Sequence, residues 1–177
     1  GLVTLSLFAT HGAMFIALKT DGEIRHRART LSVRLGLVAA ALAVVFLAWT
    51  QAKTGTLASA VLFVVAAITL LVGLFQARQG REGWAFTGTF LTIALAVAGL
   101  FTAMFPDVMP STTDVAFSLN TTNAAATAYT LKVMTWVAVV FTPIVLAYQA
   151  WTYWVFRKRI AVHHIPVPDP RSVPAEP

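Results

Sequence analysis

Five apolar segments, each close to the length that crosses a lipid bilayer, occupy most of this 177-residue chain. A helix needs about 20 apolar residues to span about 30 Å of hydrocarbon. Helices satisfy their own backbone hydrogen bonds, as lipid requires, and no segment alternates with the period of two that barrel strands show. The sequence therefore predicts an all-α integral membrane protein, a bundle of five transmembrane helices with spans at residues 1–18, 31–52, 57–77, 84–105 and 131–156.

The composition supports a membrane protein over a soluble one. Only 11% of the residues are charged and 58% are hydrophobic, whereas soluble domains carry about 25% charged residues. In a soluble domain the net charge of +6 would suggest a nucleic-acid partner. Here the basic residues lie beside apolar segments, so no nucleic-acid partner is predicted. The absence of cysteine excludes disulfides, thiolate metal sites and Cys-ligated iron–sulfur clusters.

The distribution of basic residues predicts the topology. Of the thirteen Lys and Arg residues, only Lys53 and Lys132 lie on one side of the predicted membrane. The positive-inside rule places the other side in the cytoplasm, so that the chain starts outside and its C-terminus is cytoplasmic. The residues on the cytoplasmic side are Lys19, Arg25, Arg27, Arg29, Arg34, Arg78, Arg81, Arg157, Lys158, Arg159 and Arg171.

The segments outside the spans have their own signals. The chain begins at Gly1 inside an apolar run, without a charged n-region, so we expect its natural beginning to lie upstream and do not predict a signal peptide. Pro and Thr residues in 106–130 predict a loop outside the membrane. The Pro-rich residues 161–177 predict an extended cytoplasmic tail after the 1–160 bundle.

The fifth span combines a proline with an aromatic end. Pro143 lies in its middle and predicts a kink. The inner end then carries an interfacial aromatic belt followed by a basic anchor, formed by Tyr148, Trp151, Tyr153 and Trp154 and by Arg157, Lys158 and Arg159. Elsewhere, small residues four apart predict close helix packing, at Gly36/Ala40, Ala39/Ala43, Ala94/Ala98 and Gly99/Ala103.

Ionisable residues inside a span are the usual marker of proton or ion chemistry. None of the seven Asp and Glu residues lies in a predicted span, so the chain is not expected to run such chemistry alone. His11 is the candidate within a span, as a haem or metal ligand, a proton relay, or a histidine bonded to a neighbouring helix. The packing role is favoured, because Met14 shares the helix face of His11 and Met104 and Met134 lie near the outer ends of their helices.

The sequence therefore predicts no catalytic, cofactor-binding or metal-ligating residue in this chain. His26, His163 and His164 lie in basic segments, where solvated side chains are expected. The adjacent pair His163 and His164 leaves a metal site open as an alternative.

Several local patterns together resemble a known family. They are His11-Gly12-Ala13 followed by Leu18-Lys19-Thr20; Phe105-Pro106, Pro110-Ser111 and Asn123-Ala124-Ala125; and Pro143-Ile144-Val145-Leu146-Ala147-Tyr148-Gln149 continued by Trp151, Tyr153 and Val155-Phe156-Arg157. The chain up to Ile160 resembles subunit II of the cytochrome bd-type quinol oxidases, and specifically its C-terminal half. Lys158 departs from the family, which often has Gly there, as does the Ala-rich stretch 124–127 in place of a Ser-rich one.

The resemblance implies a structural, non-catalytic subunit of a complex that oxidises quinol and reduces dioxygen to water in the respiratory chain. It implies that haem b, haem d and the quinol site belong to subunit I. The implied location is a bacterial cytoplasmic membrane, and the implied partners are subunit I, the lipid bilayer and, left open, small accessory membrane subunits. The family's N-terminal half, with its acidic motifs for proton delivery, has no counterpart in this chain. The alternative is half of a helical membrane transporter, because such bundles also repeat there.

Overall fold

The computed structural model describes residues 1–159, and the predicted tail at 161–177, with His163 and His164, lies outside the described residues. Within that range five helices are long and apolar enough to cross a membrane, which confirms the all-α class with five candidate spans. They are α1 (Leu2–Lys19), α2 (Gly22–Thr54), α3 (Leu57–Arg78), α4 (Glu82–Met104) and α5 (Ala128–Val155).

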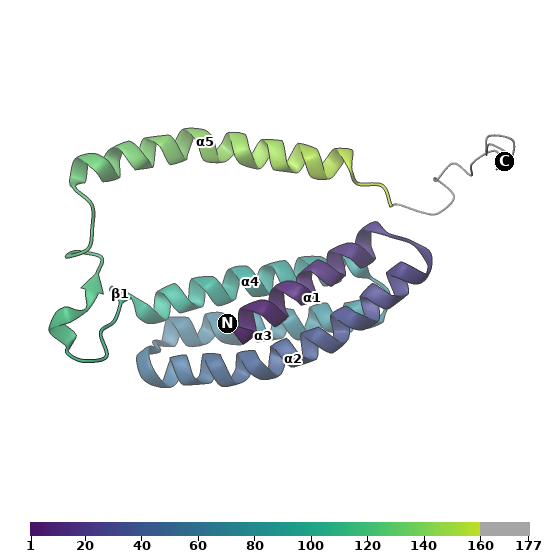
Figure 1. The fold of residues 1–177 in the computed structure, drawn as a ribbon, viewed down its shortest axis with the longest axis horizontal. Helices are drawn as coiled ribbons and strands as arrows, with labels where there is room; N and C mark the ends of the chain where they lie inside the picture. Colours follow the sequence, from purple (N-terminus) through teal and green to yellow (C-terminus); the bar gives the residue numbers. More distant parts are fainter. Residues whose placement is uncertain (160–177) are drawn as a thin grey trace, which may run out of the picture.

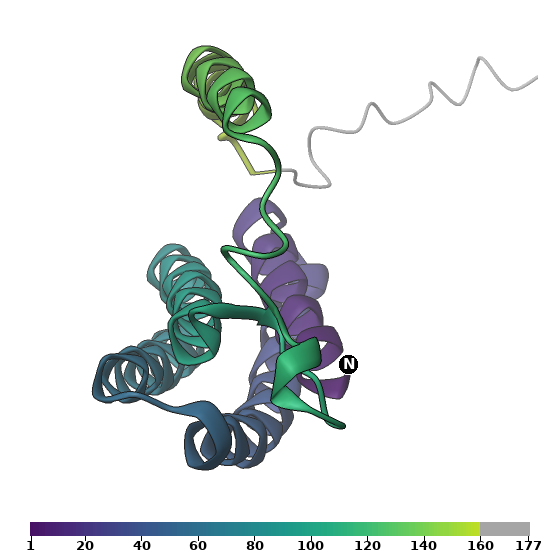
Figure 2. The ribbon, with the colours of Figure 1, turned by 90° about the vertical axis from the view of Figure 1, so that its left-hand side faces the viewer.

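Helices α1 to α4 form an antiparallel four-helix bundle (Figures 1 and 2). Connections of two or three residues join them, and such short links make successive helices antiparallel neighbours. Helix α1 packs chiefly on α2 and α3 chiefly on α4, while α2–α3 and α1–α4 contacts close the ring. The core is a cluster of buried apolar side chains, namely Met14, Leu70, Leu74, Ala77 and Ala85.

Helix α2 begins well before the predicted span at residue 31. Asp21 caps its start by accepting a hydrogen bond from the Gly22 amide, at 2.9 Å. Its 33 residues measure about 50 Å at 1.5 Å per residue, which exceeds the hydrocarbon thickness of about 30 Å. A run of apolar residues identifies only the part of a helix that contacts lipid or the protein core. The prediction from apolar length therefore missed the polar first turns of α2.

Helices α3 and α4 approach each other closely at Gly73 and Gly88. A Cβ atom added at Gly88 would stand 2.9 Å from the Gly73 Cα and 3.1 Å from the Thr69 carbonyl oxygen. Both contacts are with backbone, so the crossing requires glycine at position 88. Of the small residues predicted to pack, the structure buries Gly36, Ala39, Gly99 and Ala103 and exposes Ala94 and Ala98.

The segment between α4 and α5 contains the short strands β1 (Asp107–Met109) and β2 (Leu119–Asn120), which pair antiparallel. A single 3-10 turn, η1 (Val115–Phe117), lies between them. The structure thus adds a small hairpin to the predicted loop, and the Thr127 hydroxyl caps the start of α5.

Helix α5 stands apart from the four-helix bundle (Figures 1 and 2). None of its residues is buried, although its sequence is as apolar as that of the bundle helices. It runs through Pro143, so the proline does not end the helix, and the kink itself stays a prediction. The structure therefore differs from a five-helix bundle in one respect: four helices pack together, and nearly all of the surface of the fifth is exposed to lipid or to another protein.

Candidate functional site

A buried carboxylate lies at the end of the bundle where α1 and α3 finish and α2 and α4 begin. This end, called the basic end below, holds Glu82 as the first residue of α4, and only 4% of that residue is exposed. Arg25 of α2 donates two hydrogen bonds to it, from Nε to Oε1 at 2.8 Å and from Nη2 to Oε2 at 3.0 Å. Such a bidentate, charge-assisted pair is stronger than neutral hydrogen bonds, and it joins α2 to α4.

Two further arginines approach the same carboxylate. Arg29 Nη1 lies 3.9 Å from Glu82 Oε1, and Arg159 Nη2 lies 3.5 Å from Oε2. Arg159 follows α5, so the cluster ties the end of the detached helix to the bundle. The Lys19 ammonium adds a second link by donating a hydrogen bond to the Phe156 carbonyl at 2.6 Å.

Sequence patterns missed this cluster, since Glu82 was expected in a loop. All seven acidic residues were placed outside the predicted spans, that is, in loops or the tail, and the structure corrects this for two of them, because Glu82 and Glu23 lie in the first turns of α4 and α2. One usable signal was present. Arg25 and Arg29 are four residues apart, so they share one face of a helix. The distribution of basic residues also predicts that Glu82 lies on the same side of the membrane as these two arginines.

The second polar group lies deeper in the bundle, around His11 of α1. Its Nδ1 is 2.8 Å from the Thr89 Oγ1 of α4, and its ring stacks on Phe86 with centroids 4.3 Å apart. Thr89 also reaches the Met14 sulfur, at 3.7 Å. His11 is thus bonded to a neighbouring helix, as the favoured interpretation of this residue expects.

His11 and the methionines of the spans do not form the pair of facing ligands that a six-coordinate haem requires. One ring face of His11 is covered by Phe86 and one ring nitrogen is engaged by Thr89. Met104 lies at the end of α4 opposite the basic end, and Met134 lies near the start of α5. His26 lies at the basic end, where its Nδ1 is 3.1 Å from the Arg29 Nη2. Within residues 1–159, no group of three or more His, Asp or Glu side chains could hold a metal ion.

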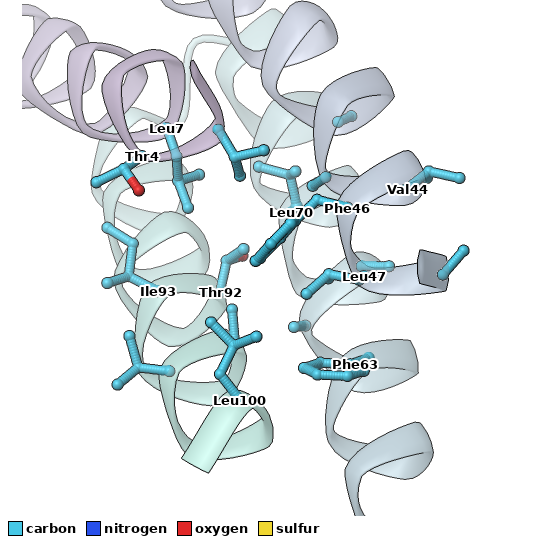
Figure 3. Close-up of a pocket in the computed structure, with 18 of the residues that line it drawn as sticks. Thr4, Leu7, Val44, Phe46, Leu47, Phe63, Leu70, Thr92, Ile93 and Leu100 are labelled. Carbon is cyan, nitrogen blue, oxygen red and sulfur yellow. The ribbon is translucent and has the colours of Figure 1, made fainter. Parts of the chain in front are cut away.

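A cavity of about 460 Å³ lies between α1, α2, α3 and α4 toward the end opposite the basic end (Figure 3). Its walls are apolar, with side chains such as Leu47, Phe63 and Leu100. The Thr92 hydroxyl is the polar group near its centre, but it already donates to the Gly88 carbonyl at 2.8 Å. The cavity suits an apolar chain and offers no acid or base for catalysis.

Across the described residues, no buried side-chain nitrogen or oxygen lacks a hydrogen-bond partner. The fold is that of a helical protein with five candidate membrane spans, in which polar side chains such as those of His11 and Glu82 pair between helices. A family model described as cytochrome bd terminal oxidase subunit II matches residues 1–156. The chain belongs to that family.

Individual relatives agree with this membership. The chain is 35% identical to cytochrome bd ubiquinol oxidase subunit 2 of Bacillus subtilis (strain 168), over 91% of the chain and 49% of the relative. It is 31% identical to cytochrome bd-I ubiquinol oxidase subunit 2 of Escherichia coli (strain K12), over 93% of the chain and 52% of the relative. The chain therefore spans about half the length of the curated relatives it matches.

Proposed function

We propose that this chain is part of subunit II of a membrane-bound quinol oxidase, a respiratory complex that reduces dioxygen to water. The observation that carries the proposal is the family match over residues 1–156. The names of the relatives supply the substrate class, ubiquinol, and the designation as a second subunit. Family membership favours this role over the alternative of a transporter half.

Within that complex the chain acts as a scaffold, and haem b, haem d and the quinol site belong to subunit I. Three observations support a scaffold role. The His11 ring is engaged by Thr89 and Phe86, and Glu82 is neutralised by arginines, so neither group is poised for proton transfer. The exposed apolar surface of α5 provides an area on which subunit I or a small accessory membrane subunit can pack.

We also infer that the basic end faces the cytoplasm of a bacterial cell, with the chain start on the outside. The antiparallel bundle supports this orientation, because it brings Lys19, Arg25, Arg29, Arg78 and Arg81 to one end. The other end carries Lys53 and, at α5, Lys132. The positive-inside rule then assigns the sides.

The test uses the full-length subunit assembled with its partner. Replacing His11 with Ala and recording reduced-minus-oxidised spectra shows whether any haem depends on this chain. All haem bands should remain, or all should fall together with the amount of complex. Thr89→Val is the matched control, since it removes the bond to His11 but removes no possible ligand. Selective loss of one haem band in His11→Ala alone, at unchanged subunit stoichiometry, would contradict the scaffold role.

A further inference from the structure

The first turns of α2 present two basic faces with different surroundings. Arg25 and Arg29 turn toward the bundle, where both approach the Glu82 carboxylate. Arg27 and Arg34 turn away from the bundle and are exposed. Arg27 pairs with Glu23, but both side chains are more than 70% exposed, so that pair is weak. Among residues 1–159, no acidic side chain lies within 4.0 Å of the Arg34 guanidinium.

The outward face contains a shallow pocket of about 360 Å³. Its lining is two guanidinium groups, an imidazole, a hydroxyl and one apolar side chain, contributed by Arg27, Arg34, His26, Thr30 and Leu31. All five come from α2, within about two turns of each other. Guanidinium groups bind phosphate oxygens through paired N–H donors, so the pocket matches a phosphate in charge and in donors.

The same face continues as an apolar stripe. At 100° per residue, Arg27, Leu31, Arg34, Val38 and Val45 lie within about 60° of one another around the helix. Val38 is 51% exposed and Val45 is 66% exposed, so they present hydrocarbon to the surroundings. A hollow lined by two arginines that continues into an exposed apolar stripe matches the layout of a phospholipid, with a charged headgroup above acyl chains.

The depth of Arg34 fits this arrangement. Helix α2 ends at Thr54, and about 20 residues counted back from there cross the hydrocarbon, so the crossing begins close to Leu35. Arg34 then lies at the hydrocarbon boundary, where lipid phosphates are found. An arginine at this depth reaches the headgroup level, where a lipid phosphate supplies a counter-charge without any movement of the helix.

We propose that the face of α2 formed by Arg27, Thr30, Leu31 and Arg34 is a specific site for an anionic phospholipid, which places its phosphate between the two arginines and an acyl chain along Val38 and Val45. The site is independent of the oxidase role proposed above. It requires only that the bundle is inserted in a membrane with its basic end at the headgroup level.

Native mass spectrometry of the assembled full-length complex tests the site. Delipidated complex receives dioleoylphosphatidylglycerol, dioleoylphosphatidylcholine or inorganic phosphate at equal concentration. Phosphatidylglycerol should be retained in preference, and Arg34→Gln should weaken its retention about fivefold. Arg78→Gln, which removes an exposed arginine at the same end but outside the pocket, should leave retention unchanged. Equal losses in both variants, or equal effects of phosphate and lipid, overturn the proposal.

A second measurement does not depend on the Arg34 variant folding. A photoreactive benzoylphenylalanine replaces Leu31 in cells, with the same replacement of Phe75, an exposed residue of α3, as control. Irradiation should link position 31 to anionic phospholipid in a larger share than position 75. Capture of a peptide at position 31, from the rest of the subunit or from a partner, shows that protein covers this face and overturns the proposal.

Discussion

Replacing Glu82 with Gln should destabilise the bundle far more than a comparable change at its surface. The substitution keeps the shape of the side chain but removes the charge that Arg25 contacts at 2.8 and 3.0 Å. Each hydrogen bond to a charged group contributes about 1.5–3 kcal/mol, and breaking a buried ion pair costs about 3–5 kcal/mol. The glutamine carbonyl still accepts one bond, and the Arg25 side chain is 26% exposed. We therefore expect a loss at the lower end, about 2 kcal/mol.

A loss of that size lowers the ratio of folded to unfolded protein about thirtyfold. The full-length subunit, purified in its complex in mild detergent, can be unfolded by titration with dodecyl sulfate and followed by near-ultraviolet circular dichroism. Glu23→Gln is the matched control, because the Glu23–Arg27 pair is exposed and contributes at most about 0.5 kcal/mol. If both variants unfold at the same denaturant concentration as the unmodified protein, the cluster around Glu82 does not stabilise the bundle and the reasoning is wrong.

Three further predictions concern packing, topology and assembly. Gly88→Ala should cost about 1–3 kcal/mol in the same unfolding titration, because its Cβ meets α3 backbone, whereas Gly83→Ala, which meets nothing within 4 Å, should be neutral. Single cysteines at Ser111 and Ser172 should react with an impermeant thiol reagent from opposite sides of the membrane, and reaction from one side refutes five crossings. Removing residues from Trp151 onward should deplete the complex from membranes, and normal assembly of the truncated chain would show that the aromatic end is dispensable.

Periodicity and apolar length were sufficient to predict the number and approximate places of the helices, because a membrane span is defined by its length in one dimension. These two signals did not predict the residues at which the helices begin and end. Helix α2 extends back to Gly22, since Asp21 caps it and its polar residues form a helix in water as readily as apolar ones do in lipid. The separation of α5 could not be predicted either, because a helix apolar all round fits a bundle centre as well as a partner's surface.

The polar contacts show a similar division. The bond from His11 to a neighbouring helix was anticipated, because a lone histidine in a span needs a partner and lipid offers none. Its partner, Thr89, could not be named, since the rotation of α4 about its axis depends on how α4 packs on α3, which includes the close contact of Gly73 with Gly88. Neither glycine belongs to the pairs of small residues, four apart within one helix, that were predicted to pack. The two glycines face each other across the α3–α4 interface, and a single sequence does not show which residues of two helices face each other.

The way α5 is held has a consequence for how this family can vary. Apart from its covalent connection, the end of α5 reaches the bundle through an edge contact between Tyr153 and Phe15, and the residues just after it through Lys19 and Glu82. Substitutions along the middle of α5 therefore leave the core of α1 to α4 untouched. Substitutions on the surface of α5 can therefore follow changes in a neighbouring protein without disturbing the packing of α1 to α4. In this fold, the helix that can vary with a partner is separate from the helices that form the core.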